Sequence, residues 1–438
     1  MPTTKIIRQT RLTRTQKETV GLLSIGTFLE YFDLMLYVHM AVLLNELFFP
    51  KTDPFTASLL SALAFCSTFV FRPFGALLFG YIGDNIGRKH TVVITTFMMA
   101  ISCLIMANLP TYSQIGITAS WLLTLCRIIQ GMSSMGEIIG AEIFLTETTK
   151  PPVQYPAVAS IVTLSTLGTF AALAVASLTT SYSFNWRLAF WIGAAIAVVG
   201  AVARTALRET PDFADAQRYL KKTFEDTTDK VEIDYKKIGK NPLLKEKVRK
   251  QTARSYFLIE CMWPVSFYFV YLHCSNVLRI SFEYTSEQII HHNLMVAIVN
   301  LLAYIIITFL SYRIYPLKIL KFRLWVFWVC ILVSPYLLER ASSPFDILII
   351  QSFFIIFRPD AFPAVPIYIK HFPIFKRFTY TSWLFAVSRA FMCITSTIIT
   401  GLRLLYLPVF TKIFLSHFTP PFVEFFSYFV PLPFDSLE

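Results

Sequence analysis

The residues of this chain that could carry chemistry are charged side chains inside long apolar stretches. Glu30 and Asp33 lie in one such stretch, and Tyr37 follows one turn later. Their spacing places all three side chains along one face of a helix. Two carboxylates one turn apart in a low dielectric repel each other, which favours the protonated form of one of them. This is what a proton-coupled carrier needs; pairing with basic residues that merely hold helices together is the open alternative.

A second apolar stretch contains Arg127, Gln130 and Glu137. At the helical rise, Arg127 and Glu137 are about 15 Å apart along the axis and cannot pair with each other. Each therefore needs a partner elsewhere. A guanidinium is suited to binding a planar carboxylate through two hydrogen bonds. For Arg127, a structural ion pair with Asp33 or Glu30 is the alternative, and breaking that pair could itself be a switch.

The composition indicates a membrane protein. Of the 438 residues, 55% are apolar and only 15% are charged, whereas soluble domains have about 25% charged residues. The apolar residues gather in runs of about 20, the length that crosses a bilayer as a helix. The first run is too long for a signal peptide and lacks a small-residue cleavage site, so we expect it to stay as an anchor.

The net charge of +12 is distributed unevenly. Lys and Arg concentrate in alternate loops, which predicts an inner (plasma) membrane protein with both termini cytoplasmic. This placement argues against nucleic acid as a partner.

The order of apolar runs predicts an all-α polytopic membrane protein with about 12 transmembrane helices in two six-helix halves. The predicted helices are 19–44, 56–82, 91–109, 116–140, 157–180, 188–206, 255–278, 291–311, 323–339, 345–365, 379–402 and 417–433. They divide the chain into a basic tail (1–18), an N-terminal half (19–206), a charged linker (207–254) with one or two surface helices, a C-terminal half (255–433) and a short tail (434–438).

A glycine-rich turn joins the second and third predicted helices. It contains Gly80, Gly83, Asp84, Gly87, Arg88 and Lys89. Glycines allow helix ends to pack closely, Asp84 can cap or pair with a neighbouring helix end, and the two bases suit a cytoplasmic loop. Together with Arg72-Pro73-Phe74-Gly75, this turn resembles the loop 2–3 signature of the major facilitator superfamily, in its metabolite:proton symporter branch.

Two helices extend the resemblance. The stretch from Gly26 to Tyr37 is similar to the symporters' helix 1 signature, with Thr27 in place of the usual asparagine. The second apolar stretch, which contains Arg127, Gln130 and Glu137, is similar to the family's helix 4 motif, Arg-x-x-Gln-Gly followed by Gly-Glu-x-x-Gly-Ala. The resemblance implies that Glu30, Asp33 and Glu137 handle protons and that Tyr37, Arg127 and Gln130 contact substrate.

Several positions depart from the family pattern. Asn85 stands where a base is usual, and Tyr312 and Tyr315 replace the Asp and Gly of the loop between helices 8 and 9. Glu147 belongs to the loop 4–5 signature, but Tyr155 replaces its arginine, which argues against a glutamate–arginine lock there. Prolines at 420, 421 and 431 interrupt the twelfth helix. The C-terminal half is therefore gated differently or has decayed.

Arg358 and Arg389 are further cations inside predicted helices. They either line the cavity or form cross-helix pairs. No metal-ligand spacing and no phosphate-binding loop occurs, so we expect no metal and no cofactor.

We therefore predict a proton-coupled secondary active transporter (symporter) of a small polar metabolite such as proline, betaine or a carboxylate. Its partners are the metabolite, protons and the lipid bilayer, and we expect a monomer. The alternative is a non-transporting sensor or a degenerate paralogue of this family. The sequence has no clustered nucleophile and base, so an enzyme is not expected.

Overall fold

A computed structural model describes residues 9–40, 44, 47–50, 67–181, 186–228 and 246–390. The predicted twelfth helix, the end of the predicted eleventh helix, the tail 434–438, residues 1–8 of the basic tail and the beginning of the predicted second helix lie outside these residues.

The described residues form helices joined by short connections, with one isolated bridge between Gln9 and Pro152. The first helix group consists of α1 (Arg14–His39), α4 (Arg72–Asn85), α5 (Arg88–Asn108), α6 (Tyr112–Ile115), α7 (Ile117–Ser134), the π-helical turn η1 (Met135–Ile139), α8 (Gly140–Thr148), α9 (Gln154–Ser181) and α10 (Trp186–Arg204). α11 (Pro211–Thr228) follows. The second helix group consists of α14 (Lys250–Phe267), the π-helical turn η2 (Tyr268–His273), α15 (Cys274–Ser281), α16 (Ser286–Arg313), α17 (Pro316–Glu339), α18 (Pro344–Phe357), α19 (Val365–Lys370) and the helix over 377–390.

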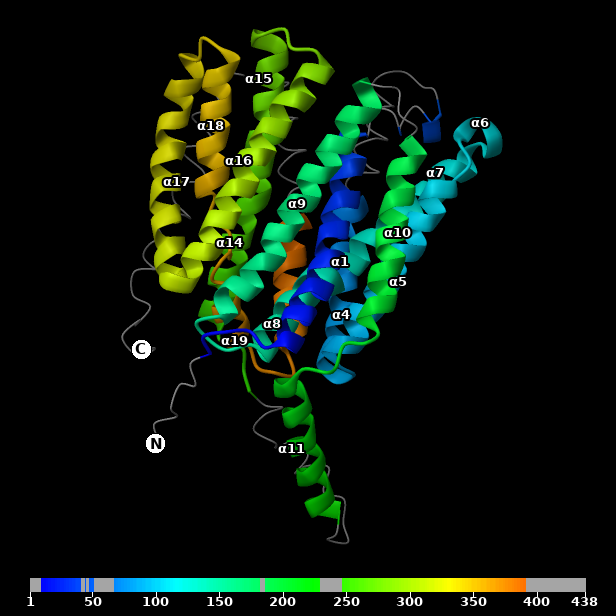
Figure 1. Ribbon diagram of the computed structural model, residues 1–438, viewed down its shortest axis with the longest axis vertical. Coiled ribbons are helices and arrows are strands. Elements are labelled where there is room, and N and C mark those ends of the chain that lie inside the picture. Colours follow the sequence, from blue (N-terminus) through cyan, green and yellow to red (C-terminus); the bar gives the residue numbers. More distant parts are fainter. Residues whose placement is uncertain are drawn as a thin grey trace.

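The two helix groups lie side by side, and α9 and α16 pack against each other where they meet (Figure 1). α9 also packs along α1, so these helices form the centre of the molecule. α11 projects beyond the bundle at one end (Figure 1). We call this end, where the connections 86–87, 149–153, 205–210 and 371–376 lie, the α11 face.

The helices are suited to a bilayer. Six helical stretches of the described chain are long and apolar enough to cross a membrane, among them Arg88–Asn108 and Glu287–Arg313. Large apolar side chains on the outer surface, such as Ile306, Phe309 and Trp325, are more than 60% exposed. An apolar exterior of this kind is stable only in lipid. The predicted all-α polytopic fold is therefore confirmed.

The predicted linker contains the helix α11 (Pro211–Thr228), and one or two helices were expected there. Two predicted helix boundaries were wrong. The fourth helix does not end at residue 140 but continues through η1 and α8 to Thr148. The predicted helix 345–365 ends at Phe357.

The last of these breaks has a local cause. Pro359 and Pro363 follow directly, and proline removes a backbone N–H and disfavours helical geometry in the residue before it. The backbone from Arg358 to Ala364 is therefore irregular before α19 begins. Irregular backbone at membrane depth is tolerated where it is buried or lines a cavity.

Candidate substrate cavity and gate

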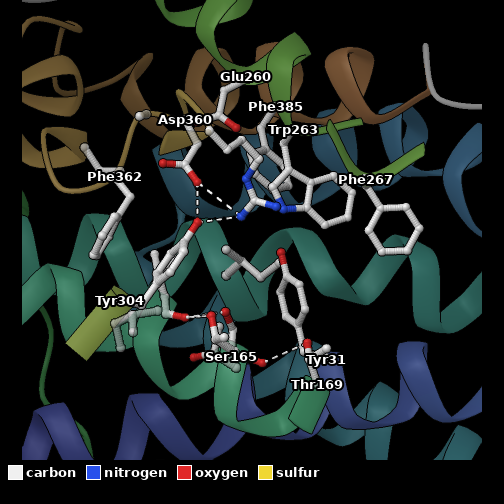
Figure 2. Close-up of a pocket in the computed structure, with 18 of the residues that line it drawn as sticks. Tyr31, Ser165, Thr169, Glu260, Trp263, Phe267, Tyr304, Asp360, Phe362 and Phe385 are labelled. Atoms are coloured by element: carbon white, nitrogen blue, oxygen red, sulfur yellow. Dashed lines mark hydrogen bonds and ion pairs between the residues drawn. The ribbon is translucent and has the colours of Figure 1, made fainter. Parts of the chain in front are cut away.

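A cavity lies between the two helix groups, and both contribute to its lining. It has about 60 Å³ of space for water-sized molecules. The first group supplies Tyr31 from α1, Glu142 from α8 and hydroxyl-bearing residues of α9; the second supplies Trp263 and Glu260 from α14 and Tyr304 from α16. The irregular segment after α18 adds Asp360 (Figure 2). It also adds Arg358, and the helix 377–390 adds Arg389.

One wall of the cavity is an ion pair within the second group. Arg389 donates to the Glu260 carboxylate at 2.9 Å and to the Glu260 backbone carbonyl at 2.6 Å. Its guanidinium also lies 4.6 Å from the ring centroid of Trp263. Arg389 thus both lines the cavity and forms a cross-helix pair, the two alternatives that its sequence position left open.

The neighbouring wall is a network around Asp360. Arg323 donates to Asp360 at 3.1 Å, and Arg358 approaches the other carboxylate oxygen at 3.4 Å. The Tyr304 hydroxyl donates to Asp360 and accepts a hydrogen bond from Arg358 at 2.5 Å (Figure 2). The Nε atom of Arg358 has no hydrogen-bond partner among the described residues. Arg358 is therefore held in place with part of its hydrogen-bonding capacity unused.

Glu142 is the third carboxylate of the cavity lining. It is 4% exposed and makes no hydrogen bond or ion pair with any described residue. Sequence reasoning missed Glu142, Glu260 and Asp360. The signal was present, because each is an acid within or beside an apolar stretch, and Asp360 follows Arg358 by only two positions.

The candidates Asp33, Arg127, Gln130 and Tyr37 form one cluster outside this cavity lining. Arg127 donates to Asp33 at 3.0 Å and to the amide oxygen of Gln130 at 2.9 Å. Its guanidinium lies 4.1 Å from the ring centroid of Tyr37. All four side chains are buried, and the Nε and Nη2 atoms of Arg127 have no hydrogen-bond partner among the described residues. The structure therefore contains the Arg127–Asp33 pair that was one of the two expectations for this arginine.

The other two acidic candidates are also paired within the first group. Arg72 donates to Glu30 at 3.1 Å. Glu137 pairs with Arg204 and accepts a hydrogen bond from Thr96 at 2.6 Å. Neither arginine was identified as a partner from the sequence, because these partners come from different helices. Glu30 and Glu137, like Asp33, do not line the cavity.

The glycine-rich turn contacts the second helix group at the α11 face. The carboxylate of Asp84 accepts hydrogen bonds from the backbone amides of Phe378 and Thr379, both at 2.9 Å. These are amides at the beginning of the helix 377–390, which have no acceptor within their own helix. A Cβ atom at Gly80 would lie 2.7 Å from Cα of Thr379, and one at Gly83 would lie 2.4 Å from the ring of Phe378. The two glycines thus permit the contact that Asp84 makes.

The rest of the turn positions the start of α5. Gly87 has a φ of +148°, a conformation that favours glycine. The Glu209 carboxylate accepts hydrogen bonds from the backbone amides of Arg88 and Lys89, both at 3.2 Å. Asn85 is exposed and donates a hydrogen bond to the carbonyl of Tyr81.

A glutamate–arginine lock is present at this face although Tyr155 replaces the arginine of the loop 4–5 signature, and its arginines are Arg88 and Arg377. Arg88 donates to Glu147 at 3.2 Å, and Arg377 from the second group donates to it at 2.8 Å. Thr210 adds a hydrogen bond at 2.6 Å. Burial would raise the pKa of Glu147, but the two guanidinium groups outweigh it and hold that pKa below its usual range. The arginine partner was missed because it lies 230 residues further along the chain.

The unusual tyrosines meet at the same face. The rings of Tyr155 and Tyr315 pack edge to face with centroids 6.1 Å apart, and the Tyr312 hydroxyl donates to the carbonyl of Thr10 at 3.3 Å. An aromatic contact between the two helix groups therefore occupies two positions, 155 and 315, where the resemblance led us to expect an arginine and a glycine.

Comparison with known proteins gives the family. The model of the Major Facilitator Superfamily matches residues 23–402. The chain is 36% identical over 208 residues to the inner membrane metabolite transport protein YhjE of Escherichia coli K12, covering 45% of this chain and 47% of that protein. It is 32% identical over 208 residues to the proline/betaine transporter of Salmonella typhimurium LT2, covering 45% and 41%. The chain thus spans about half the length of the curated relatives that it matches.

Solved structures share the fold over most of the chain. The proton:xylose symporter XylE bound to 6-bromo-6-deoxy-D-glucose aligns with a TM-score of 0.72 and 12% identity, over 92% of this chain and 96% of that one. The human organic anion transporter MFSD10 aligns with a TM-score of 0.64 and 14% identity, over 86% and 92%. At these identities the likeness concerns the fold.

Proposed function

Because the chain belongs to the major facilitator superfamily, we propose that it is a proton-coupled symporter of a small polar metabolite that works by alternating access. It is an integral multi-pass membrane protein of a transporter family and not an enzyme. The finer assignment is supported by relatives that transport metabolites, proline and betaine. We further propose that it resides in the inner (plasma) membrane, that the α11 face is cytoplasmic, and that the protein acts as a monomer.

The observation that carries this proposal is the cavity between the two helix groups. Charged and aromatic side chains from both groups line it, which suits a site at the interface of two halves that move against each other. On the α11 face the two groups are joined by the lock around Glu147. The described structure thus corresponds to a state closed at that face.

We propose that proton coupling uses the buried Asp33–Arg127 pair. Protonation of Asp33 would remove the charge that holds Arg127 at 3.0 Å and would release the guanidinium to rearrange. Glu30 and Glu137 are paired in the same way and are the next candidates. Breaking such a buried pair changes the free energy by several kcal/mol, about 3–5 when one partner is removed, which is enough to shift a conformational equilibrium.

The test is uptake into proteoliposomes with an imposed inward proton gradient and labelled proline, glycine betaine, α-ketoglutarate and citrate. We expect accumulation of at least one compound and its collapse on addition of a protonophore. Absence of uptake of all four compounds by folded protein would contradict the proposed function and favour the sensor or degenerate paralogue.

Asp33→Asn tests the coupling residue. We expect it to abolish accumulation driven by the proton gradient, whereas Glu18→Gln, an exposed acid at the beginning of the same helix, should leave accumulation unchanged. Thermal stability measured in parallel separates loss of coupling from loss of folding. If Asp33→Asn still concentrates substrate, Asp33 is not the coupling residue.

A further inference from the structure

The carboxylates of the cavity differ in their surroundings. Glu260 is paired with Arg389, and Asp360 is held by Arg323 and Arg358. Glu142 is as deeply buried as these two acids, but it makes no ion pair or hydrogen bond with the described part of the chain. An unpaired buried carboxylate destabilises a protein, so Glu142 is costly in the folded structure unless a ligand supplies its partner.

An arginine with unused hydrogen-bonding capacity lines the same cavity from the other helix group. Arg358 shares its acid, Asp360, with Arg323, which binds that acid at the shorter distance of 3.1 Å compared with 3.4 Å. The Nε atom of Arg358 is buried and has no partner among the described residues. The cavity therefore contains an incompletely neutralised cation in the second group and, in the first, a buried carboxyl group that has no partner among the described residues.

Other charged and titratable groups surround Glu142. Glu260 and Tyr256 face it from α14, Asp360 from the segment after α18, and Arg389 from the helix 377–390. Tyr31 lines the cavity from α1, whereas α9 contributes only apolar and hydroxyl-bearing side chains. The Nε atom of Arg389 also has no hydrogen-bond partner among the described residues. Arg389 does not share its acid, however, because it donates to both the carboxylate and the backbone carbonyl of Glu260, so its charge is matched without Glu142.

We propose that Glu142 binds the cationic group, and Arg358 the carboxylate, of a zwitterionic substrate. This inference rests on the proposed transport function and names its substrate class. Such a substrate would bridge the two helix groups, because its two ends would bind residues of different groups. The rings of Tyr31, Trp263 and Phe267 line the same space (Figure 2), and aromatic faces attract substituted ammonium groups.

The same arrangement disfavours a dicarboxylate or tricarboxylate. A second carboxylate would lie among Glu142, Glu260 and Asp360, and like charges at short range in a low dielectric repel strongly. Glu142 is thus a specificity-determining residue, which selects for substrates with no net negative charge.

Kinetics of uptake by wild-type protein and Glu142→Gln in proteoliposomes test this inference. The substitution keeps the size of the side chain and removes its charge. We expect wild-type protein to accumulate glycine betaine or proline but not α-ketoglutarate or citrate. The KM of Glu142→Gln for the transported zwitterion should rise about tenfold or more, because a hydrogen-bonded charge pair is lost. Glu18→Gln is the control with the same change of charge outside the cavity.

Thermal stability distinguishes a ligand-binding role from a structural one. Glu142→Gln removes a buried carboxyl group that has no partner in the described part of the chain, so it should leave the melting temperature of the unliganded protein equal or raise it. Glu260→Gln removes one partner of the buried ion pair with Arg389 and should lower the melting temperature. Loss of stability in Glu142→Gln would indicate that Glu142 has a structural partner and would contradict the inference.

Three transport outcomes are also decisive. Accumulation of carboxylates but not of zwitterions by wild-type protein would overturn the inference and leave the proposed transport function in place. An unchanged KM for the zwitterion in Glu142→Gln would overturn it as well. If that variant keeps its KM and loses only its response to the protonophore, Glu142 is a proton site and the inference is again overturned. No uptake of any compound by wild-type protein would instead contradict the transport function itself.

Discussion

The ion pair between Arg377 and Glu147 provides a quantitative test of how the α11 face is held closed. Arg377 donates to Glu147 at 2.8 Å and is the member of this lock that comes from the second helix group. In Arg377→Ala the carboxylate keeps its hydrogen bonds from Arg88 and Thr210, so no orphaned charge is created. The substitution therefore removes one contact between the helix groups and, within the second group, the hydrogen bond from Arg377 to the Phe372 carbonyl.

The size of the effect follows from that contact. A hydrogen bond to a charged group contributes about 1.5–3 kcal/mol, and we take about 2 kcal/mol for Arg377. Since about 1.4 kcal/mol corresponds to a tenfold change in an equilibrium constant, the equilibrium between the closed and open face should shift about 30-fold toward the open one.

Hydrogen–deuterium exchange of the backbone amides of Phe378 and Thr379 measures this shift. Both amides donate to Asp84 and have no acceptor in their own helix, so their protection depends on contact between the two groups. After correction for intrinsic rates, we expect these amides to exchange about 30-fold faster in Arg377→Ala. Lys376→Ala removes a neighbouring charge whose one side-chain hydrogen bond to a described residue is to the exposed carbonyl of Glu246. The amides of Phe378 and Thr379 should exchange in this variant as they do in the wild type.

The result that would refute this reasoning is equal exchange at Phe378 and Thr379 in the wild type and Arg377→Ala. It would mean that the ion pair contributes nothing to closure. An equally large increase in Lys376→Ala would instead attribute the effect to the net charge of the loop.

Two further predictions concern the same face. Gly83→Ala should also increase the exchange of the Phe378 amide, because the added Cβ would lie 2.4 Å from the Phe378 ring. Gly21→Ala is the control, since its added Cβ would have no other atom within 4 Å and should leave exchange unchanged. Unchanged exchange in Gly83→Ala would show that the turn and the helix do not pack this closely. The depressed pKa of Glu147 means that its contribution to stability is present above the usual glutamate range and is lost as the pH falls through the depressed value. The difference in melting temperature between the wild type and Glu147→Gln should therefore be constant above about pH 5 and shrink at lower pH; a difference that grows on acidification would contradict the assignment of the lock.

The fold was predictable from the sequence because its main signals are local. Apolar runs of membrane-spanning length predict helices wherever they occur, and the acids at Glu30 and Asp33 are visible because charge is rare in such runs. The end of α18 was also visible in principle, since Pro359 and Pro363 follow it, but the apolar character of the segment outweighed them in the prediction.

The partners of these residues could not be predicted, because they depend on packing between helices far apart in sequence. Arg72 is 42 residues from Glu30, and Arg204 is 67 residues from Glu137. The cavity itself was only partly foreseen. Arg358 and Arg389 were chosen as cations in apolar helices, whereas Glu142 was overlooked because it follows the helix 4 motif and is not part of it.

The distribution of ion pairs explains how the two helix groups could move without breaking the interior. Within the described residues, the buried pairs of Glu30, Asp33 and Glu137 lie inside the first group, and those of Glu260 and Asp360 lie inside the second. Removing one partner of such a pair costs about 3–5 kcal/mol, so a motion that separated several of them would be prohibitive.

The charged contacts between the groups are instead concentrated at the α11 face, where Glu147 binds Arg377 and Asp84 binds the beginning of the helix 377–390. Opening at that face would admit water to these same groups. Hydrogen bonds to water would offset part of the free energy lost when the groups separate. Glu142 fits this arrangement because it lines the interface between the groups and forms no ion pair with a described residue of either group. A rigid-body rotation can therefore preserve every interior pair, and a substrate bound between Glu142 and Arg358 would add an attraction that exists only while the two groups are close together.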